Sequence, residues 1–186
     1  HIHPDHFDPV AIDILPKDMP LYCQPFDLEN IQAHGFNAVQ AIEQTTAWEG
    51  ITIHRTGGKH GTGEILKMLG EVSGFILQAP GEPTLYLVGD SILEEQVRQT
   101  LQAFPHDVIV TNSGGAVIPG HGAILMDEAE TVEMAQLVPE ATLIAVHIES
   151  LDHCQVTRTS LRKAGEAAGI PNPRLLIPND GEAFSF

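Results

Sequence analysis

Short runs of valine, isoleucine and leucine recur along the whole chain, and most of them are followed by glycine, proline or aspartate. Apolar runs of this length, bounded by turn residues, are typical of β-strands. Between them lie segments with the 3.6-residue period of amphipathic helices. The sequence predicts strands at residues 20–23, 38–42, 51–56, 73–78, 84–88, 107–112, 122–126, 142–147, 174–177 and 182–186. It predicts helices at residues 93–103, 127–138 and 159–168, and two weaker ones at 8–14 and 27–34.

Many strands interleaved with helices predict an α/β (α+β) fold in which layered sheets are flanked by helices. No repeat, low-complexity tract or linker divides the 186 residues, so we expect one domain over residues 1–186. No apolar run approaches the roughly 18 residues that a membrane span needs. We therefore expect no membrane partner.

The charge of the chain excludes one large class of partners. Nine lysines and arginines stand against 25 aspartates and glutamates, which gives a formal net charge of −16. Such a field repels phosphate backbones and anionic membrane surfaces, so long nucleic acid is excluded as a partner. The only cysteines, Cys23 and Cys154, are far apart in the sequence and fit a reducing compartment, which predicts a cytoplasmic protein.

The chain holds ten histidines, and three of them fall within its first six residues, His-Ile-His-Pro-Asp-His. In an extended stretch alternate side chains share a face, so His1 and His3 can bind the same metal ion. Pro4 turns the chain, and Asp5 and His6 can then face a neighbouring ion. Four ligand-type side chains exceed what one tetrahedral ion needs, which favours two metals. The alternative is a histidine-rich tail, although a tail would hardly interleave proline and aspartate in this way.

The opening segment resembles the H-x-H-x-D-H signature of the metallo-β-lactamase superfamily. The later signatures of the superfamily follow in order: His60 in a glycine-rich loop, Gly89-Asp90 after a strand, and His147 after another strand. Segments 56–62, 78–90 and 145–154 resemble the branch that contains ascorbate-6-phosphate lactonase-like hydrolases. The resemblance extends from residue 1 to the last predicted strand and implies an αββα sandwich.

The resemblance also implies a set of metal ligands. Two metals, about 3.5 to 4 Å apart, share a bridging hydroxide that attacks the substrate. Asp5 can orient this hydroxide or receive its proton, so Asp5 and Asp90 are the catalytic candidates. The ligands that the resemblance implies are His1, His3 and His60 for one metal, Asp5, His6 and His147 for the other, and Asp90 as a bridge between both.

The superfamily carries further strands before the histidine motif, whereas here the motif opens the chain. A chain end frays unless it is tied down, which makes a ligand at position 1 hard to hold. We therefore expect that the sequence begins partway through the natural domain and lacks its N-terminal portion.

Three further residues are candidates for substrate binding, each with a structural alternative. His153 follows His147 closely and can reach the site, or it can serve as an ordinary hydrogen-bonding group. Lys59 neighbours His60 and can meet an anionic group, although a lone loop lysine is more often solvated. His121 lies in a glycine-rich loop of the kind that lines clefts, although an exposed turn is the commoner setting for such a residue.

Together these features predict a metal-dependent hydrolase that acts on a small ester, lactone or phosphorylated metabolite. Two alternatives stay open: a phosphodiesterase or nuclease of the same superfamily, and a metal-binding protein without turnover. Zinc is the expected metal for a histidine-rich site, and manganese or iron also suits the carboxylates. The expected partner is a small-molecule substrate. Members of the resembled branch often self-associate, so the resemblance is compatible with a homo-oligomer, although the sequence itself does not specify the oligomeric state.

Overall fold

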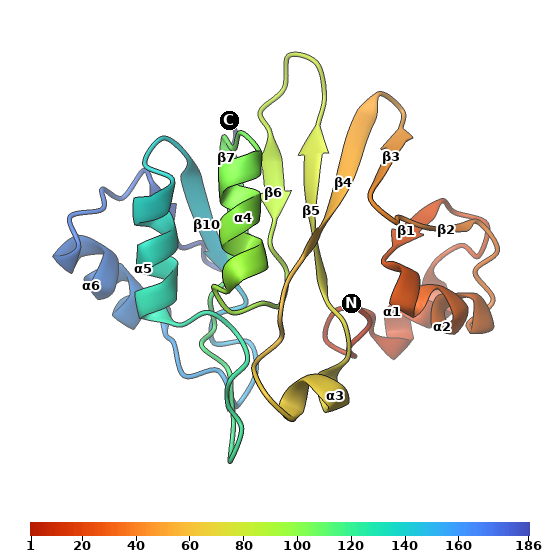
Figure 1. The fold of residues 1–186 in the computed structure, drawn as a ribbon, viewed down its shortest axis with the longest axis horizontal. Helices are drawn as coiled ribbons and strands as arrows, with labels where there is room; N and C mark the ends of the chain where they lie inside the picture. Colours follow the sequence, from red (N-terminus) through yellow and green to blue (C-terminus); the bar gives the residue numbers. More distant parts are fainter.

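The body of the molecule is a seven-stranded mixed sheet (Figure 1). The computed structural model describes residues 1–186. In sequence order the strands of this sheet are β3 (Thr45–Trp48), β4 (Ile51–Gly57), β5 (Ser73–Gln78), β6 (Leu85–Leu87), β7 (Val108–Asn112), β10 (Thr142–Val146) and β11 (Leu175–Leu176). Their spatial order is β11-β10-β7-β6-β5-β4-β3.

Strand direction decides where the polar loops meet. β6, β7, β10 and β11 pair in parallel, whereas β3, β4, β5 and β6 pair antiparallel in succession. β4 and β6 both run antiparallel to β5, so β4 runs in the same direction as β6, β7 and β10. The carboxyl ends of these four strands therefore lie at one edge of the sheet, which is where ligand sites form in sheets of this kind.

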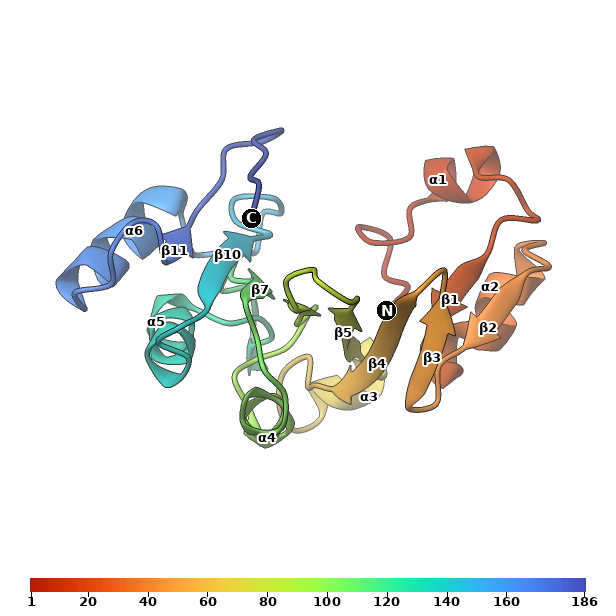
Figure 2. The ribbon, with the colours of Figure 1, turned by 90° about the horizontal axis from the view of Figure 1, so that it is seen from above.

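Helices cover one face of the sheet. They are α4 (Glu95–Ala103), α5 (Glu128–Leu137) and α6 (Arg158–Ala167). Figure 2 shows α4 and α5 on the same side of the sheet, with α6 beside β11. Asp127 caps α5 by accepting a hydrogen bond from the Glu130 N–H, and Thr157 and Ser160 form a capping box on α6. The main core lies between these helices and the sheet and includes the fully buried Tyr86.

A small second layer is formed by the N-terminal quarter of the chain. β1 (Leu21–Cys23) and β2 (Val39–Ala41) pair in parallel, and α1 (Pro9–Ile14), a 3₁₀ turn (Pro25–Asp27) and α2 (Leu28–Ala33) accompany them. Cys23, Ile31 and Phe36 form a small core of their own. The remaining elements are α3 (Ile65–Leu69) and the hairpin of β8 (Val117–Ile118) and β9 (Gly122–Ala123).

The predicted layered α/β architecture is confirmed, and several details differ. The strand predicted at 182–186 is wrong, because no neighbouring strand pairs with this segment and Phe186 is 61% exposed. The strand predicted at 122–126 shortens to β9, since residues 124–126 turn inward into the core. β3 and α3 have no counterpart in the prediction. β3 is an edge strand without apolar alternation, and α3 is only a short turn of helix. None of the helices has both the length and the apolar character that crossing a bilayer requires.

Candidate metal centre

The polar edge of the sheet collects side chains from four separate segments. His60 follows β4, Asp90 follows β6, and His147 follows β10 directly. The N-terminal segment lies at the same edge (Figure 1). It turns where Pro4 was expected to turn it, because the backbone N–H groups of His6 and Phe7 both donate to the His3 carbonyl, each at 2.9 Å.

The first group consists of His1, His3 and His60, whose ligand-type atoms all lie within 4.8 Å of one another. Two of these rings are held by main-chain carbonyls. His60 Nδ1 donates to the Ile124 carbonyl at 2.8 Å, and His3 Nε2 donates to the Leu69 carbonyl at 3.0 Å. Each bond fixes the tautomer, so that His60 Nε2 and His3 Nδ1 are left as lone-pair donors for a metal.

The second group consists of Asp5, His6, Asp90 and His147, and its ligand-type atoms also lie within 4.8 Å of one another. His147 Nε2 lies 3.1 Å from Asp5 Oδ2, and His147 Nδ1 lies 2.9 Å from the Ser150 hydroxyl. This group is the more open of the two, since the side chains of Asp5 and His6 are 29% and 27% exposed.

Asp90 faces both groups. Its Oδ2 lies 3.6 Å from His1 Nε2, 3.5 Å from His60 Nε2 and 3.1 Å from His6 Nε2. Its Oδ1 accepts a hydrogen bond from the side-chain amide of Asn112 at 2.5 Å. Asp90 thus lies in the position that a bridging carboxylate would need.

His147 has an unusual backbone conformation, with φ at 58° in the left-handed region. Histidine enters this region more readily than most residues, although at some cost in free energy. A glycine beside the turn makes room for it. Gly114 lies so close to the His147 carbonyl oxygen that a Cβ at position 114 would collide with that oxygen. The strained turn directs the His147 ring toward Asp5.

The donor set fits transition-metal ions. His1 Nε2 is buried and has no hydrogen-bond partner, which is costly for a polar atom unless a ligand satisfies it. Five imidazoles with two carboxylates are the donors that zinc, manganese and iron accept in proteins.

Comparison with known proteins places the chain in a family. No family model matches it. It is 32% identical over 188 residues to the UPF0173 protein YddR of Bacillus subtilis, and the match covers 100% of this chain and 74% of YddR. The chain belongs to the UPF0173 family.

Two solved structures resemble this UPF0173 chain over nearly its whole length. An isothiocyanate hydrolase from Delia radicum gut bacteria is 34% identical with a TM-score of 0.94, and the match covers 100% of this chain and 75% of that one. A possible metal-dependent hydrolase from Veillonella parvula is 36% identical with a TM-score of 0.93, and the match covers 98% of this chain and 72% of that one. The metallo-β-lactamase fold protein YhfI from Bacillus subtilis shares the architecture, with a TM-score of 0.70 at 18% identity; the match covers 98% of this chain and 73% of that one. This UPF0173 chain is a metal-dependent hydrolase with the metallo-β-lactamase fold.

Electrostatics at the centre of this UPF0173 chain keep Asp90 ionised. Burial alone would raise the pKa of Asp90, but hydrogen bonds from His6 and Asn112 outweigh it and hold the pKa at about 2. The hydrogen bond to Asp90 raises the pKa of His6. Burial lowers the pKa of His60, which favours the neutral ring that a metal requires.

The three predicted substrate-binding residues lie apart from the two ligand groups. The Lys59 ammonium pairs with Glu94, with Nζ 3.5 Å from Oε2. His121 is exposed at the turn between β8 and β9, and His153 is exposed with its carbonyl accepting from the Val117 N–H. No hydrogen bond or ion pair joins these three side chains to the two groups, and their role in substrate binding stays a prediction.

Sequence reasoning missed two residues that orient the predicted ligands, Asn112 and Ser150. A signal for Asn112 exists in retrospect, because it ends β7, the strand beside β6, at the edge where Asp90 lies. Cys154 is half-buried, with its Sγ 3.9 Å from His147 Nδ1.

Proposed function

We propose that this chain hydrolyses a small uncharged electrophile, namely an ester, a lactone or an isothiocyanate, at a centre of two divalent metals. His1, His3 and His60 would hold one metal, and Asp5, His6 and His147 the other. When bound, the two cations would lower the pKa of a shared water toward neutrality and polarise the scissile bond. The convergence of both groups on Asp90 Oδ2 carries the proposal.

The side chains of the protein would orient the metal ligands and accept the proton of the attacking water. The hydrogen bonds to Leu69 and Ile124 hold two rings in the orientation that donates a lone pair, so little reorganisation is needed on binding. Asp5 is a partly exposed carboxylate on the open side of the centre. It is therefore placed to accept the proton of the attacking water, at the cost of its contact with His147.

The surroundings of the open group favour an uncharged substrate. A cavity of about 430 Å³ lies against Asp5, His6 and His147, and Val146 and Leu151 supply apolar surface there. Its lining contains no lysine or arginine. Arg158, the cation in the adjoining cavity at His147, is already paired with Glu149 and Asp180. An anionic phosphate group would therefore find no free cationic side chain, which weighs against a phosphorylated metabolite or a phosphodiester.

The similar isothiocyanate hydrolase supports the same substrate class, because an isothiocyanate presents an uncharged electrophilic carbon. Zinc is the metal we propose, with manganese or iron as alternatives. The two free cysteines, Cys23 and Cys154, support a cytoplasmic location.

A substrate panel tests the proposal. The metal-loaded protein is assayed with 4-nitrophenyl acetate, a small lactone, benzyl isothiocyanate, 4-nitrophenyl phosphate and bis(4-nitrophenyl) phosphate. We expect turnover of one or more of the first three, abolished by a chelator and by His60→Ala. Faster turnover of either phosphate would contradict the uncharged substrate class. Stoichiometric metal without turnover of any compound would favour a metal-binding protein instead.

A further inference from the structure

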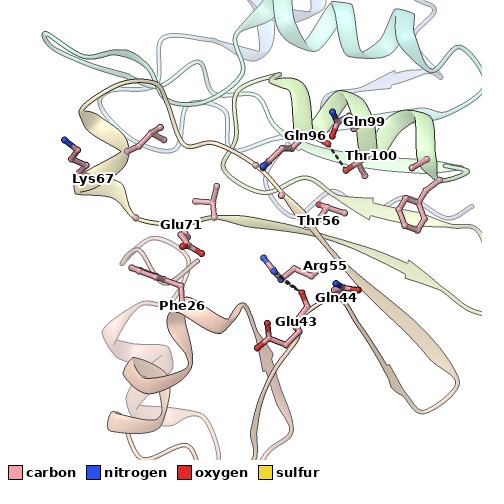
Figure 3. Close-up of a pocket in the computed structure, with 17 residues that line it drawn as sticks. Phe26, Glu43, Gln44, Arg55, Thr56, Lys67, Glu71, Gln96, Gln99 and Thr100 are labelled. Carbon is pink, nitrogen blue, oxygen red and sulfur yellow. Dashed lines mark hydrogen bonds between the residues drawn. The ribbon is translucent and has the colours of Figure 1, made fainter.

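A second cavity, of about 870 Å³, lies on the helix-covered side of the sheet, between β4, α3 and α4 (Figure 3). None of the seven candidate metal ligands lines it. Its walls carry an arginine, two glutamates and several side-chain amides, together with a few apolar groups. The feature that distinguishes it is Arg55, whose guanidinium is held by the protein and still has N–H groups without an acceptor.

Arg55 is the fixed cation of this cavity. Its Nε and Nη2 donate to the Glu43 carbonyl at 3.1 and 2.9 Å, and its Nη1 donates to the Ser73 hydroxyl at 3.1 Å. Ser73 is itself buried and held by Gln24. The guanidinium is thus held in one orientation, and two of its five N–H donors have no acceptor in the protein. No carboxylate lies within 4.0 Å of it, although the chain contains 25 acidic residues.

Two carboxylates border the same space. Figure 3 shows Glu43 and Glu71 on either side of the Arg55 guanidinium. Neither carboxylate forms an ion pair or accepts a hydrogen bond. The hydrogen bonds that these two residues accept go to their main-chain carbonyls. The other charged group, Lys67, is directed to Glu64, with Nζ 3.1 Å from both carboxylate oxygens. The charged groups of the cavity without a partner are therefore one cation and two anions.

The rest of the lining suits a short apolar group with some polar surface. Leu66, Val72 and Phe104 contribute apolar walls, and Phe26 stands at the mouth, where it is 60% exposed. The side-chain amide of Gln96 borders the cavity without a hydrogen-bond partner of its own. An apolar side chain placed here would be removed from water.

From these groups we propose that the cavity is a binding site for a zwitterionic α-amino acid with an apolar side chain. The ligand carboxylate accepts hydrogen bonds from the two free N–H groups of Arg55. This is the bidentate geometry that a guanidinium favours. The ligand ammonium lies between the Glu43 and Glu71 carboxylates, and the side chain packs on Leu66 and Val72. This site is separate from the metal centre and does not depend on the proposed hydrolytic function.

Calorimetric titration of the purified protein with L-leucine tests the site. We expect saturable binding of one molecule per chain with a dissociation constant below about 1 mM. Leucinamide lacks the carboxylate, and 4-methylpentanoate lacks the ammonium, so each should bind at least about tenfold more weakly. Absence of saturable binding up to about 10 mM, or equal binding of 4-methylpentanoate, would overturn the proposal.

Variants distinguish binding of L-leucine in this cavity from chelation of a metal by L-leucine at the metal centre. Glu71→Gln and Arg55→Gln should each weaken L-leucine binding about tenfold or more. Glu71→Gln removes no hydrogen bond of the fold, so it remains informative if Arg55→Gln unfolds. Arg98→Gln alters a surface arginine outside the cavity and should bind as the parent does. His60→Ala should also retain binding, whereas binding that is lost in His60→Ala and kept in Glu71→Gln would assign the amino acid to the metal centre.

Discussion

The two ligand groups at the sheet edge differ in burial and in what holds their histidine rings. In the first group the side chains of His1 and His60 are 5% and 4% exposed. In the second group the side chains of Asp5 and His6 are 29% and 27% exposed, and that of His147 is 11% exposed. The first group would thus retain an ion more firmly, whereas the second meets the solvent from which a substrate would arrive.

The supports of the two groups follow the same division. Main-chain carbonyls of Leu69 and Ile124 fix the rings of the buried group. Side chains fix the open group, since Ser150 contacts His147 and Asp5 contacts the same ring from its other side. Side-chain supports can move during a reaction more readily than the backbone of a packed loop can. We infer that the ion of the buried group exchanges more slowly than the ion of the open group.

The largest effect is expected from Asp90, because its carboxylate faces both groups. Asp90→Asn removes a negative charge 3.1 to 3.6 Å from three imidazoles. We expect the loss of both metals and a fall in activity of at least about a thousandfold. Metal content and turnover measured on the same preparation check this. An Asp90→Asn protein that keeps two metals would remove the bridging role, and Asp107→Asn serves as a matched control away from the centre.

The comparison between the groups is tested most sharply by two histidine variants. His147→Ala should lose the ion of the open group and keep the buried one, so that about one metal per chain remains. His60→Ala should lose the buried ion and should also lower the unfolding temperature of the metal-loaded protein, because it leaves the Ile124 carbonyl without its partner. Loss of both metals in each variant, or equal unfolding temperatures in both, would contradict the division into two groups.

A smaller effect is expected from the residue that orients Asp90. Asn112→Ala removes the amide that donates to Asp90 Oδ1, so the carboxylate gains freedom to rotate. We expect metal affinity to fall about 10- to 100-fold, while the fold is retained. Competition with a chromogenic chelator measures this. Asn172→Ala, which changes an exposed amide near α6, should have no effect on metal affinity.

The smallest effect concerns the metal-free protein in acid. The pKa of Asp90 lies at about 2, below its ordinary 3.8. A depressed pKa contributes stability that is present above pH 4 and is lost as pH falls toward 2, here roughly 2 kcal/mol. The raised pKa of His6 acts with the opposite sign, so its contribution is present below about pH 6.5 and is lost as pH rises. Urea unfolding of the chelated protein between pH 2 and 4 should show the first loss, and Asp90→Asn should show it less steeply.

Much of this arrangement could be predicted from sequence because its parts follow the simplest patterns. His60, Asp90 and His147 each come after an apolar run, and parallel strands deliver such residues to one edge. The supports of the histidine rings could not be predicted in this way. The Leu69 and Ile124 carbonyls are groups that every residue carries, and only the folded chain selects them. Arg55 likewise gave no signal, because its importance depends on the absence of a carboxylate partner.

The same limit explains the errors in secondary structure. Segment 182–186 has the alternation of a strand but no neighbour to pair with, whereas β3 lacks the alternation and pairs with β4 nevertheless. Pairing is a property of the whole sheet, and a local pattern does not contain it.

Elemental analysis of the purified protein counts the metal ions that the two groups hold. We expect close to two transition-metal ions per chain, falling to about one in His147→Ala. Fewer than one ion per chain after incubation with excess zinc, manganese or iron would contradict it.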